Sequence, residues 1–275
     1  MSLVVSIVKT LAFFFLLQGI AFAALLKLWL FPPDLVLIFF AVQLIFYLGI
    51  FFFLVKNRRL FYNIWNGEQE TKVNGANKIT LFRITMLPFL VFLTLISQQW
   101  GGPRGKALSP AAGPVLTAAF ALTFASDFFD GRLARVKKLE TYIGRILDSA
   151  SDYLLLGIIT GAFFYFKLIK PWIFLVIIIR LFLNALVMLT LMLVHRKLQP
   201  QTTPLGKIAI ASIMVLLVME AAMVPWLERW IPWAEGAAAL IIGVSMIDKI
   251  VYLIKGLKSG PGSATAQIGP SAKAG

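Results

Sequence analysis

Long apolar runs are the feature that most limits how this chain can fold. Each run has about 20 mainly hydrophobic residues, the length that an α-helix needs to cross the hydrocarbon core of a bilayer. Hydrophobic residues make up 60% of the 275 residues, and charged residues only 14%. We therefore predict an all-α polytopic membrane helix bundle. The expected spans are residues 3–31, 34–55, 79–98, 112–133, 141–167, 171–194, 205–227 and 236–256.

The basic residues predict the orientation of these spans. The chain has 26 Lys and Arg against 12 Asp and Glu, a net charge of +14. We interpret this excess as a signal of membrane topology and not of nucleic-acid binding, because it is spread over short loops and accompanies no nucleic-acid motif. Most of the basic residues lie in alternate loops, and we expect these loops and both termini to be cytoplasmic. These loops contain Lys56, Arg58, Arg59, Lys72, Lys78, Arg132, Arg135, Lys137, Lys138, Arg196, Lys197, Lys207, Lys255 and Lys258.

Three segments of the chain are considered separately. Residues 1–55 are expected to form an N-terminal transmembrane hairpin. Its first span lacks a clear signal-peptide cleavage site; the alternative is that this span is a signal peptide that is removed. Residues 56–78 predict a cytoplasmic or interfacial segment, either an amphipathic helix or a plain loop. Residues 259–275 are rich in Gly, Ser, Ala and Pro and predict a disordered tail.

Four aspartates stand at the ends of two apolar stretches. Asp127 and Asp130 are three residues apart, and Asp148 and Asp152 four apart, so on helices each pair shares one face. Carboxylates are costly at a membrane helix and repel one another, and bound cations remove both penalties. Oxygen-only ligands in a chain without cysteine favour Mg²⁺ or Mn²⁺. We therefore expect a divalent-metal site that serves phosphate chemistry.

The pattern around these aspartates resembles a family signature. It reads Asp127-x-x-Asp130-Gly131-x-x-Ala134-Arg135, then eight residues, then Gly144-x-x-x-Asp148-x-x-x-Asp152. This is similar to the signature of the CDP-alcohol phosphotransferases, membrane enzymes of phospholipid synthesis. The resemblance implies a six-helix core over residues 79–258, preceded by two extra helices. It also implies a homodimer in a bacterial inner membrane, with the active site facing the cytoplasm.

The resemblance also implies roles for individual residues. Two divalent ions would be held by Asp127, Asp130, Asp148 and Asp152 and would bridge the CDP pyrophosphate. Asp152 would be the catalytic base that activates the acceptor hydroxyl, and CMP would leave. The residues expected to contact the CDP-alcohol are Gly131, Ala134, Arg135, Gly144, Asn77 and Thr80.

Asn77 and Thr80 belong to a second match, Asn74-Gly-Ala-Asn77-Lys-Ile-Thr80-Leu-Phe-Arg83. It resembles the start of the first core helix in bacterial members that use CDP-diacylglycerol, such as phosphatidylglycerophosphate synthases. An alternative interpretation is that Asn77 and Thr80 only form a helix start.

The acceptor alcohol depends on weaker signals. Arg180 lies within an apolar run, and Gly206-Lys207 resembles a Gly-Lys near the acceptor region of phosphatidylglycerophosphate synthases, so Arg180 and Lys207 are candidate acceptor ligands. Those synthases typically carry polar residues where this chain has Tyr153, Leu181 and Ile210, which puts glycerol-3-phosphate in doubt. Serine, inositol phosphate, or diacylglycerol with CDP-choline or CDP-ethanolamine stay open. A different class, a divalent-cation transporter using the same aspartates, is the other alternative.

Overall fold

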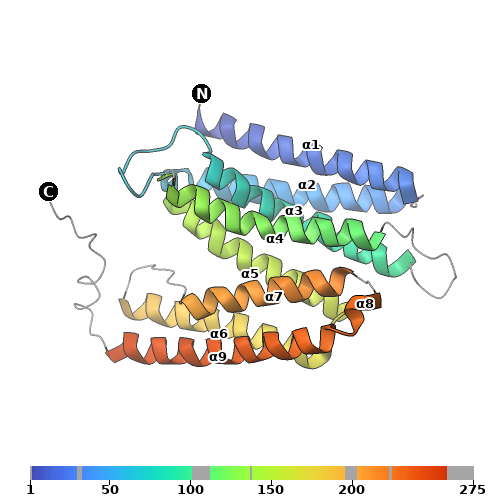
Figure 1. Ribbon diagram of the computed structural model, residues 1–275. Coiled ribbons are helices and arrows are strands. Elements are labelled where there is room, and N and C mark those ends of the chain that lie inside the picture. The colour runs from blue at the N-terminus through green and yellow to red at the C-terminus, as the bar shows by residue number, and fades with distance from the viewer. Residues whose placement is uncertain are drawn as a thin grey trace. The chain divides into compact units, whose positions relative to one another are not determined.

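The protein is mainly helical in the part that the computed structural model describes, which is residues 2–29, 33–100, 112–136, 138–195, 203–222 and 225–258. The expected tail, 259–275, lies outside it. The helices are α1 (Leu3–Trp29), α2 (Pro33–Lys56), α3 (Gly75–Trp100), α4 (Ala112–Val136), α5 (Tyr142–Tyr165), α6 (Pro171–His195), α7 (Pro204–Ala222), α8 (Pro225–Glu228) and α9 (Ile231–Lys258), with a 3₁₀ turn at Arg58–Leu60 (Figure 1). The predicted all-α class is confirmed.

The predicted spans recur as the long helices, with shifted ends. Within the described ranges, seven helices are long and apolar enough to cross a membrane, and α4 contributes a shorter apolar stretch, Pro114–Asp127. Four helices begin with proline, whose fixed φ and missing N–H suit the first helical position. Pro225 also explains why the predicted span 205–227 is two helices, because a proline cannot continue the hydrogen bonding of α7.

The start of α3 differs from the expectation in a similar way. This helix begins at Gly75, and the side chain of Asn74 accepts a hydrogen bond from the Asn77 N–H at 2.9 Å. The helix therefore starts one turn before the predicted span, with Asn74 as the capping residue, so Asn77 and Thr80 lie inside the helix.

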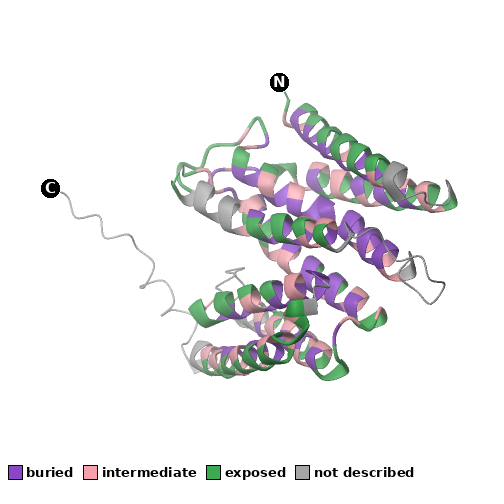
Figure 2. Cartoon of the chain, turned by 45° about the vertical axis from the view of Figure 1, so that its right-hand side comes forward, coloured by how far each residue is buried: buried purple, intermediate pink, exposed green. Residues whose placement is uncertain are grey.

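The chain divides into two compact units, residues 1–170 with 217–231, and residues 171–216 with 232–275. In the first unit, α3 packs against α1, α2, α4 and α5 and is buried along most of its length (Figure 2). The second unit contains α6, most of α7, and α9.

The N-terminal hairpin, α1 and α2, docks onto α3 inside the first unit. An aromatic cluster fills the contact, with the rings of Phe22 and Phe39 stacked at 3.7 Å and Phe92 edge-on to both. Beside it, the Gln43 amide donates to Gln18 at 2.9 Å, and the Gln18 amide donates to the Thr85 hydroxyl at 3.2 Å. Buried amides in an apolar environment need such partners, so these bonds fix the register between hairpin and α3.

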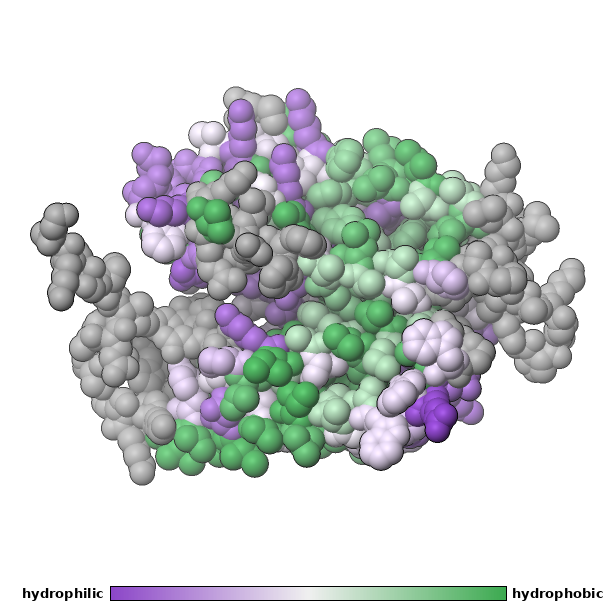
Figure 3. Space-filling view, viewed as in Figure 1, coloured by the Kyte–Doolittle hydropathy of each residue, from purple (hydrophilic) through white to green (hydrophobic). Residues whose placement is uncertain are grey.

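Residues 57–74 form a loop, and the amphipathic helix considered for this segment is absent from it. The loop is tied to the turn between α4 and α5: the Ile64 N–H donates to the Glu140 carbonyl at 2.9 Å, and the Tyr142 N–H donates to the Tyr62 carbonyl at 3.2 Å. The rings of Tyr62 and Tyr142 also stack at 5.5 Å. Hydrophilic residues gather at this end of the first unit (Figure 3). The loop therefore anchors the start of α5, which carries two of the aspartates.

Candidate functional site

Three of the four predicted aspartates meet in the first unit. Asp127 comes from α4, and Asp148 and Asp152 come from successive turns of α5. One carboxylate oxygen from each lies within 4.8 Å of the others. Their side chains are 31%, 51% and 20% exposed, respectively, so the cluster is partly accessible from outside the helix bundle. Asp130 also belongs to α4, but its side chain lies outside the described part of the structure.

Arg83 of α3 is fully buried against this cluster. Its Nη1 donates to Asp127 Oδ1, its Nη2 donates to Asp148 Oδ1 at 2.7 Å, and the same Nη2 lies 3.3 Å from Asp152 Oδ1. The guanidinium therefore links α3 to the carboxylates of both α4 and α5. Sequence reasoning assigned no role to Arg83. The signal that could have indicated one is a charged arginine inside the apolar run Leu-Phe-Arg-Ile.

Ser151 completes the surroundings of Arg83. Its hydroxyl accepts a hydrogen bond from Arg83 Nε at 2.9 Å and donates to the Asp148 carbonyl at 2.7 Å. Ser151 is fully buried. It orients the guanidinium toward the carboxylates, and sequence reasoning missed it because a serine in a helix carries no distinctive pattern.

Gly144 lies where α5 approaches α3 closely. A Cβ added there would clash with the Asn77 amide oxygen and would come within 2.9 Å of Thr141 Oγ1. Asn77 itself is buried and donates to Thr141 Oγ1 at 2.9 Å, and Thr141 caps α5 by accepting from the Gly144 N–H at 3.1 Å. Asn77 and Gly144 thus hold the start of α5 against α3. Thr80 is buried one turn further along α3 and donates to the Ala76 carbonyl at 3.2 Å.

The remaining residues predicted to contact the CDP-alcohol follow Asp130 in α4. They are Gly131, Ala134 and Arg135, which lie in the last two turns of the helix. Their side-chain positions fall outside the described part, so their role stays a prediction.

The acceptor candidates lie in the second unit. Arg180 is 1% exposed in α6, and its Nη2 donates to the Gly206 carbonyl of α7 at 2.7 Å. Lys249 of α9, 9% exposed, lies against the same glycine, since a Cβ on Gly206 would be 3.8 Å from Lys249 Cε. Lys207 is exposed. Two buried cations therefore converge on Gly206, and sequence reasoning found only Arg180, because Lys249 is distant along the chain.

The donor set of the aspartate cluster suits a divalent ion. Carboxylate oxygens are the hard ligands that Mg²⁺ and Mn²⁺ prefer. Oxygens around one such ion lie up to about 4 Å apart at bond lengths of about 2.1 Å. The observed spacing within 4.8 Å needs only a small contraction. The cluster could hold a metal ion.

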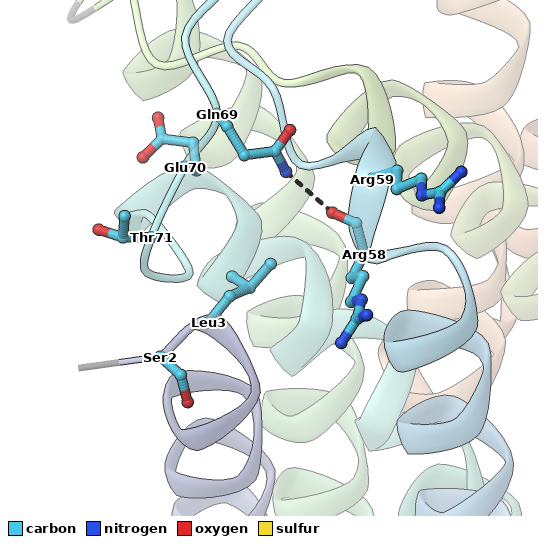
Figure 4. Close-up of a pocket in the computed structure, with 7 residues that line it drawn as sticks. All are labelled: Ser2, Leu3, Arg58, Arg59, Gln69, Glu70 and Thr71. Atoms are coloured by element: carbon cyan, nitrogen blue, oxygen red, sulfur yellow. Dashed lines mark hydrogen bonds between the residues drawn. The ribbon is translucent and has the colours of Figure 1, made fainter.

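A separate hollow lies between the start of α1 and the loop at residues 57–74 (Figure 4). Its volume is about 320 Å³, and Gln69 Nε2 donates to the Arg58 carbonyl in its wall at 3.0 Å (Figure 4). None of the aspartates lines it. The lining residues are Ser2, Leu3, Arg58, Arg59, Gln69, Glu70 and Thr71.

Comparison with known proteins finds relatives that share part of this chain. This chain is 34% identical over 113 residues to the CDP-diacylglycerol–glycerol-3-phosphate 3-phosphatidyltransferase of Bacillus subtilis. The aligned part covers 40% of this chain and 57% of the relative. The enzyme of the same name from Rickettsia typhi is 32% identical over 87 residues, or 32% and 43% of the two chains. The CMP-forming cardiolipin synthase of Streptomyces coelicolor is 28% identical over 152 residues, or 53% and 66%. The matches thus cover between 43% and 66% of the length of these relatives.

The sequence profile of the CDP-alcohol phosphatidyltransferases matches residues 73–242, more than half of the chain. The match includes α4 and α5 with all four aspartates, Arg83, and the α6–α7 segment with Arg180. It begins after the N-terminal hairpin. The chain is a member of the CDP-alcohol phosphatidyltransferase family.

Proposed function

We propose that this protein transfers the phosphatidyl group of CDP-diacylglycerol to the hydroxyl of a polar alcohol and releases CMP. The observation that carries the proposal is the convergence of Asp127, Asp148 and Asp152 in a chain of this family. Relatives named for CDP-diacylglycerol and glycerol-3-phosphate support the choice of donor and make glycerol-3-phosphate the first acceptor to test.

The aspartates would hold the divalent ions, two of them of the Mg²⁺ or Mn²⁺ type, with Asp130 as the fourth ligand. Such ions, when bound, neutralise negative charge on the pyrophosphate and on the leaving phosphate. The protein's contribution is to fix the carboxylates: α4 and α5 present them, and the Thr141 cap together with Asn77 sets the start of α5. The ion type and number are part of the proposal.

Asp152 is assigned as the base. It is the least exposed of the three described aspartates and lies one turn beyond Asp148 on α5. In the reaction, the acceptor O–H gives its proton to the Asp152 carboxylate, and the freed oxygen bonds to the phosphorus of the phosphatidyl group. The bond from that phosphorus to the bridging oxygen of the pyrophosphate breaks, and CMP leaves with the bond electrons.

A phosphorylated acceptor is favoured by the buried cations of the second unit. Arg180 and Lys249 bring two positive charges to Gly206, and the Asp248 carboxylate lies close enough to Lys249 to interact with it. These three groups keep a net positive charge, which favours an anion such as a phosphate monoester. Serine, which carries no phosphate, fits this pair less well. Diacylglycerol as acceptor, with CDP-choline or CDP-ethanolamine as donor, has the same disadvantage.

A second candidate acceptor comes from the cardiolipin synthase of Streptomyces coelicolor, whose match covers more of this chain than that of the Bacillus enzyme. Phosphatidylglycerol is the alcohol that such a reaction would use. We also propose that the protein lies in a bacterial inner membrane as a homodimer, with its active site facing the cytoplasm. The basic loops support this orientation.

The direct test uses the purified protein in detergent with labelled CDP-diacylglycerol and Mg²⁺ or Mn²⁺. The acceptors are glycerol-3-phosphate, phosphatidylglycerol, inositol phosphate and serine, and a parallel series uses CDP-choline with diacylglycerol. We expect metal-dependent CMP release that is fastest with glycerol-3-phosphate. The absence of CMP release with every pair would overturn the enzymatic proposal, and uptake of divalent ions by proteoliposomes would then favour a transporter.

A further inference from the structure

A fully buried arginine lies among the carboxylates that are assigned to the metal ions. All three nitrogens of Arg83 are engaged: Nε by Ser151 at 2.9 Å, Nη1 by Asp127, and Nη2 by Asp148 at 2.7 Å. Asp152 Oδ1 lies 3.3 Å from the same Nη2. Each of the three aspartates therefore directs its Oδ1 atom toward one guanidinium.

The charges explain why this arrangement is favourable for the fold. Three carboxylates within a few ångströms repel one another, and a buried guanidinium without acceptors would be strongly destabilising. Together they compensate: the arginine removes part of the repulsion, and the carboxylates supply acceptors for its donors. The aspartate cluster thus contains a cation that the chain itself provides.

The same arrangement opposes a second cation. A divalent ion at these carboxylates would sit a few ångströms from the positive charge of Arg83. It would draw on the Asp127 and Asp148 oxygens that already accept hydrogen bonds from Arg83, and on the Asp152 oxygen that forms an ion pair with it. When two ligands compete for one set of atoms, each lowers the affinity for the other by the same factor. A guanidinium fixed by the fold acts as such a competitor at high local concentration.

We propose that Arg83 is an internal counter-ion that competes with divalent metal for Asp127, Asp148 and Asp152. It is a positioning residue: it keeps the three carboxylates together, and it lowers their affinity for metal. Metal binding then requires the guanidinium to move away from the Oδ1 atoms. An anionic donor such as a CDP-alcohol favours this exchange, because its pyrophosphate offers Arg83 new acceptors and adds negative charge for the ions. This inference rests on the metal site of the proposed function.

The test measures Mn²⁺ binding by the purified full-length protein in detergent, without substrate, by electron paramagnetic resonance of the free ion. We compare the wild type with Arg83→Met, which removes the charge and keeps an apolar stem. We expect Arg83→Met to bind Mn²⁺ about tenfold more tightly, within the usual range for coupled sites. The midpoint of thermal unfolding of Arg83→Met in EDTA should lie below that of the wild type. Adding Mn²⁺ should raise the midpoint of Arg83→Met by more than it raises the midpoint of the wild type.

Two further variants separate competition from simple support of the carboxylates. Arg83→Lys keeps the charge, so its Mn²⁺ affinity should stay within about threefold of the wild type. If Arg83 only supported the aspartates, both substitutions would weaken Mn²⁺ binding. That outcome, or unchanged affinity in a folded Arg83→Met, would overturn the inference. If Arg83→Met does not fold, Arg83→Lys alone decides. A Mn²⁺ affinity of Arg83→Lys more than about tenfold weaker than that of the wild type overturns the inference, and an affinity within about threefold of the wild type supports it.

The controls distinguish this inference from the proposed function. Arg145→Met removes an exposed arginine that pairs with Glu140 at 2.9 Å near the start of α5, and it should leave Mn²⁺ affinity unchanged. Asp148→Asn should abolish tight Mn²⁺ binding. If Asp148→Asn abolishes binding but Arg83→Met does not tighten it, only the role of Arg83 fails. If the wild type binds no Mn²⁺ at all, the proposed metal site fails and this inference fails with it.

Discussion

The starts of α5 and α7 use the same local design for different surroundings. Each has a threonine three residues before a glycine, Thr141 with Gly144 and Thr203 with Gly206. In both, the glycine N–H donates to the threonine hydroxyl at 3.1 Å. In both, the glycine also lets a side chain from another helix come close. The local sequence pattern therefore does not distinguish the two sites.

The residues that approach each glycine differ in chemistry. At Gly144 the space is filled by the amide of Asn77, and one turn further along α5 the carboxylates surround Arg83. At Gly206 the carbonyl accepts from Arg180, and the stem of Lys249 lies nearby. The first region carries more negative than positive charge, and the second gathers two cations. Opposite ligands follow: divalent ions for the first, and an anionic phosphate for the second.

The largest expected effect tests the first region through Asp152→Asn. This change removes the base but keeps the shape of the side chain, so we expect kcat to fall about 10²- to 10⁴-fold. Binding of the CDP-alcohol, followed by equilibrium dialysis of the labelled donor, should change little. Asp34→Asn, at the start of α2, is the matched control and should retain activity. A comparable loss of donor binding would assign Asp152 to metal retention.

An intermediate effect is expected in the second region. Arg180→Gln and Lys249→Gln should each raise KM for glycerol-3-phosphate about 10- to 100-fold with little change in kcat, since a hydrogen bond to a charged group contributes about 1.5–3 kcal/mol. Lys207→Gln should have a smaller effect, because its side chain is exposed. Steady-state kinetics over a range of acceptor concentrations checks this. An unchanged KM in both Arg180→Gln and Lys249→Gln would show that these residues do not bind the acceptor phosphate.

The smallest effect concerns the two glycines directly. Gly144→Ala should lower the free energy of unfolding by about 1–3 kcal/mol, because the new methyl group would meet the Asn77 amide and the Thr141 hydroxyl. Gly206→Ala should cost less, since its nearest neighbour would be Thr203 Oγ1 at 3.1 Å. Gly161→Ala, with open space around it in α5, should be neutral or stabilising by up to about 1 kcal/mol.

Detergent unfolding followed by circular dichroism ranks the three alanine variants. An equal loss of stability for Gly144→Ala and Gly161→Ala would show that helix propensity, and not the close approach to α3, decides the effect.

The helices and the aspartates were accessible to sequence reasoning because both are local patterns. A run of apolar residues of bilayer length predicts a span whatever it packs against, and two aspartates one turn apart share a face of any helix. Asp127, Asp148 and Asp152 lie close together in the structure. The Asp–Gly–Ala–Arg signature added the family, which the profile match over residues 73–242 confirms.

The missed features all depend on pairing between distant segments. Arg83 was read as part of a helix start, but its role comes from contacts with α4 and α5. Lys249 meets Gly206 only after α7 and α9 pack together. The hairpin docks through Gln18 and Gln43, whose hydrogen bonds no local periodicity indicates. Such contacts follow from tertiary packing, which a single sequence does not encode in its local pattern.

The most direct test of the account is the position of metal in a crystal of the protein grown with Mn²⁺ and CDP-diacylglycerol. Anomalous scattering locates the ions independently of any interpretation of the side chains. We expect Mn²⁺ at about 2.0–2.3 Å from carboxylate oxygens of Asp127, Asp148 and Asp152, with Arg83 turned away from them. Manganese bound elsewhere, with Arg83 still enclosed by the three aspartates, would contradict the assignment of this cluster as the metal centre.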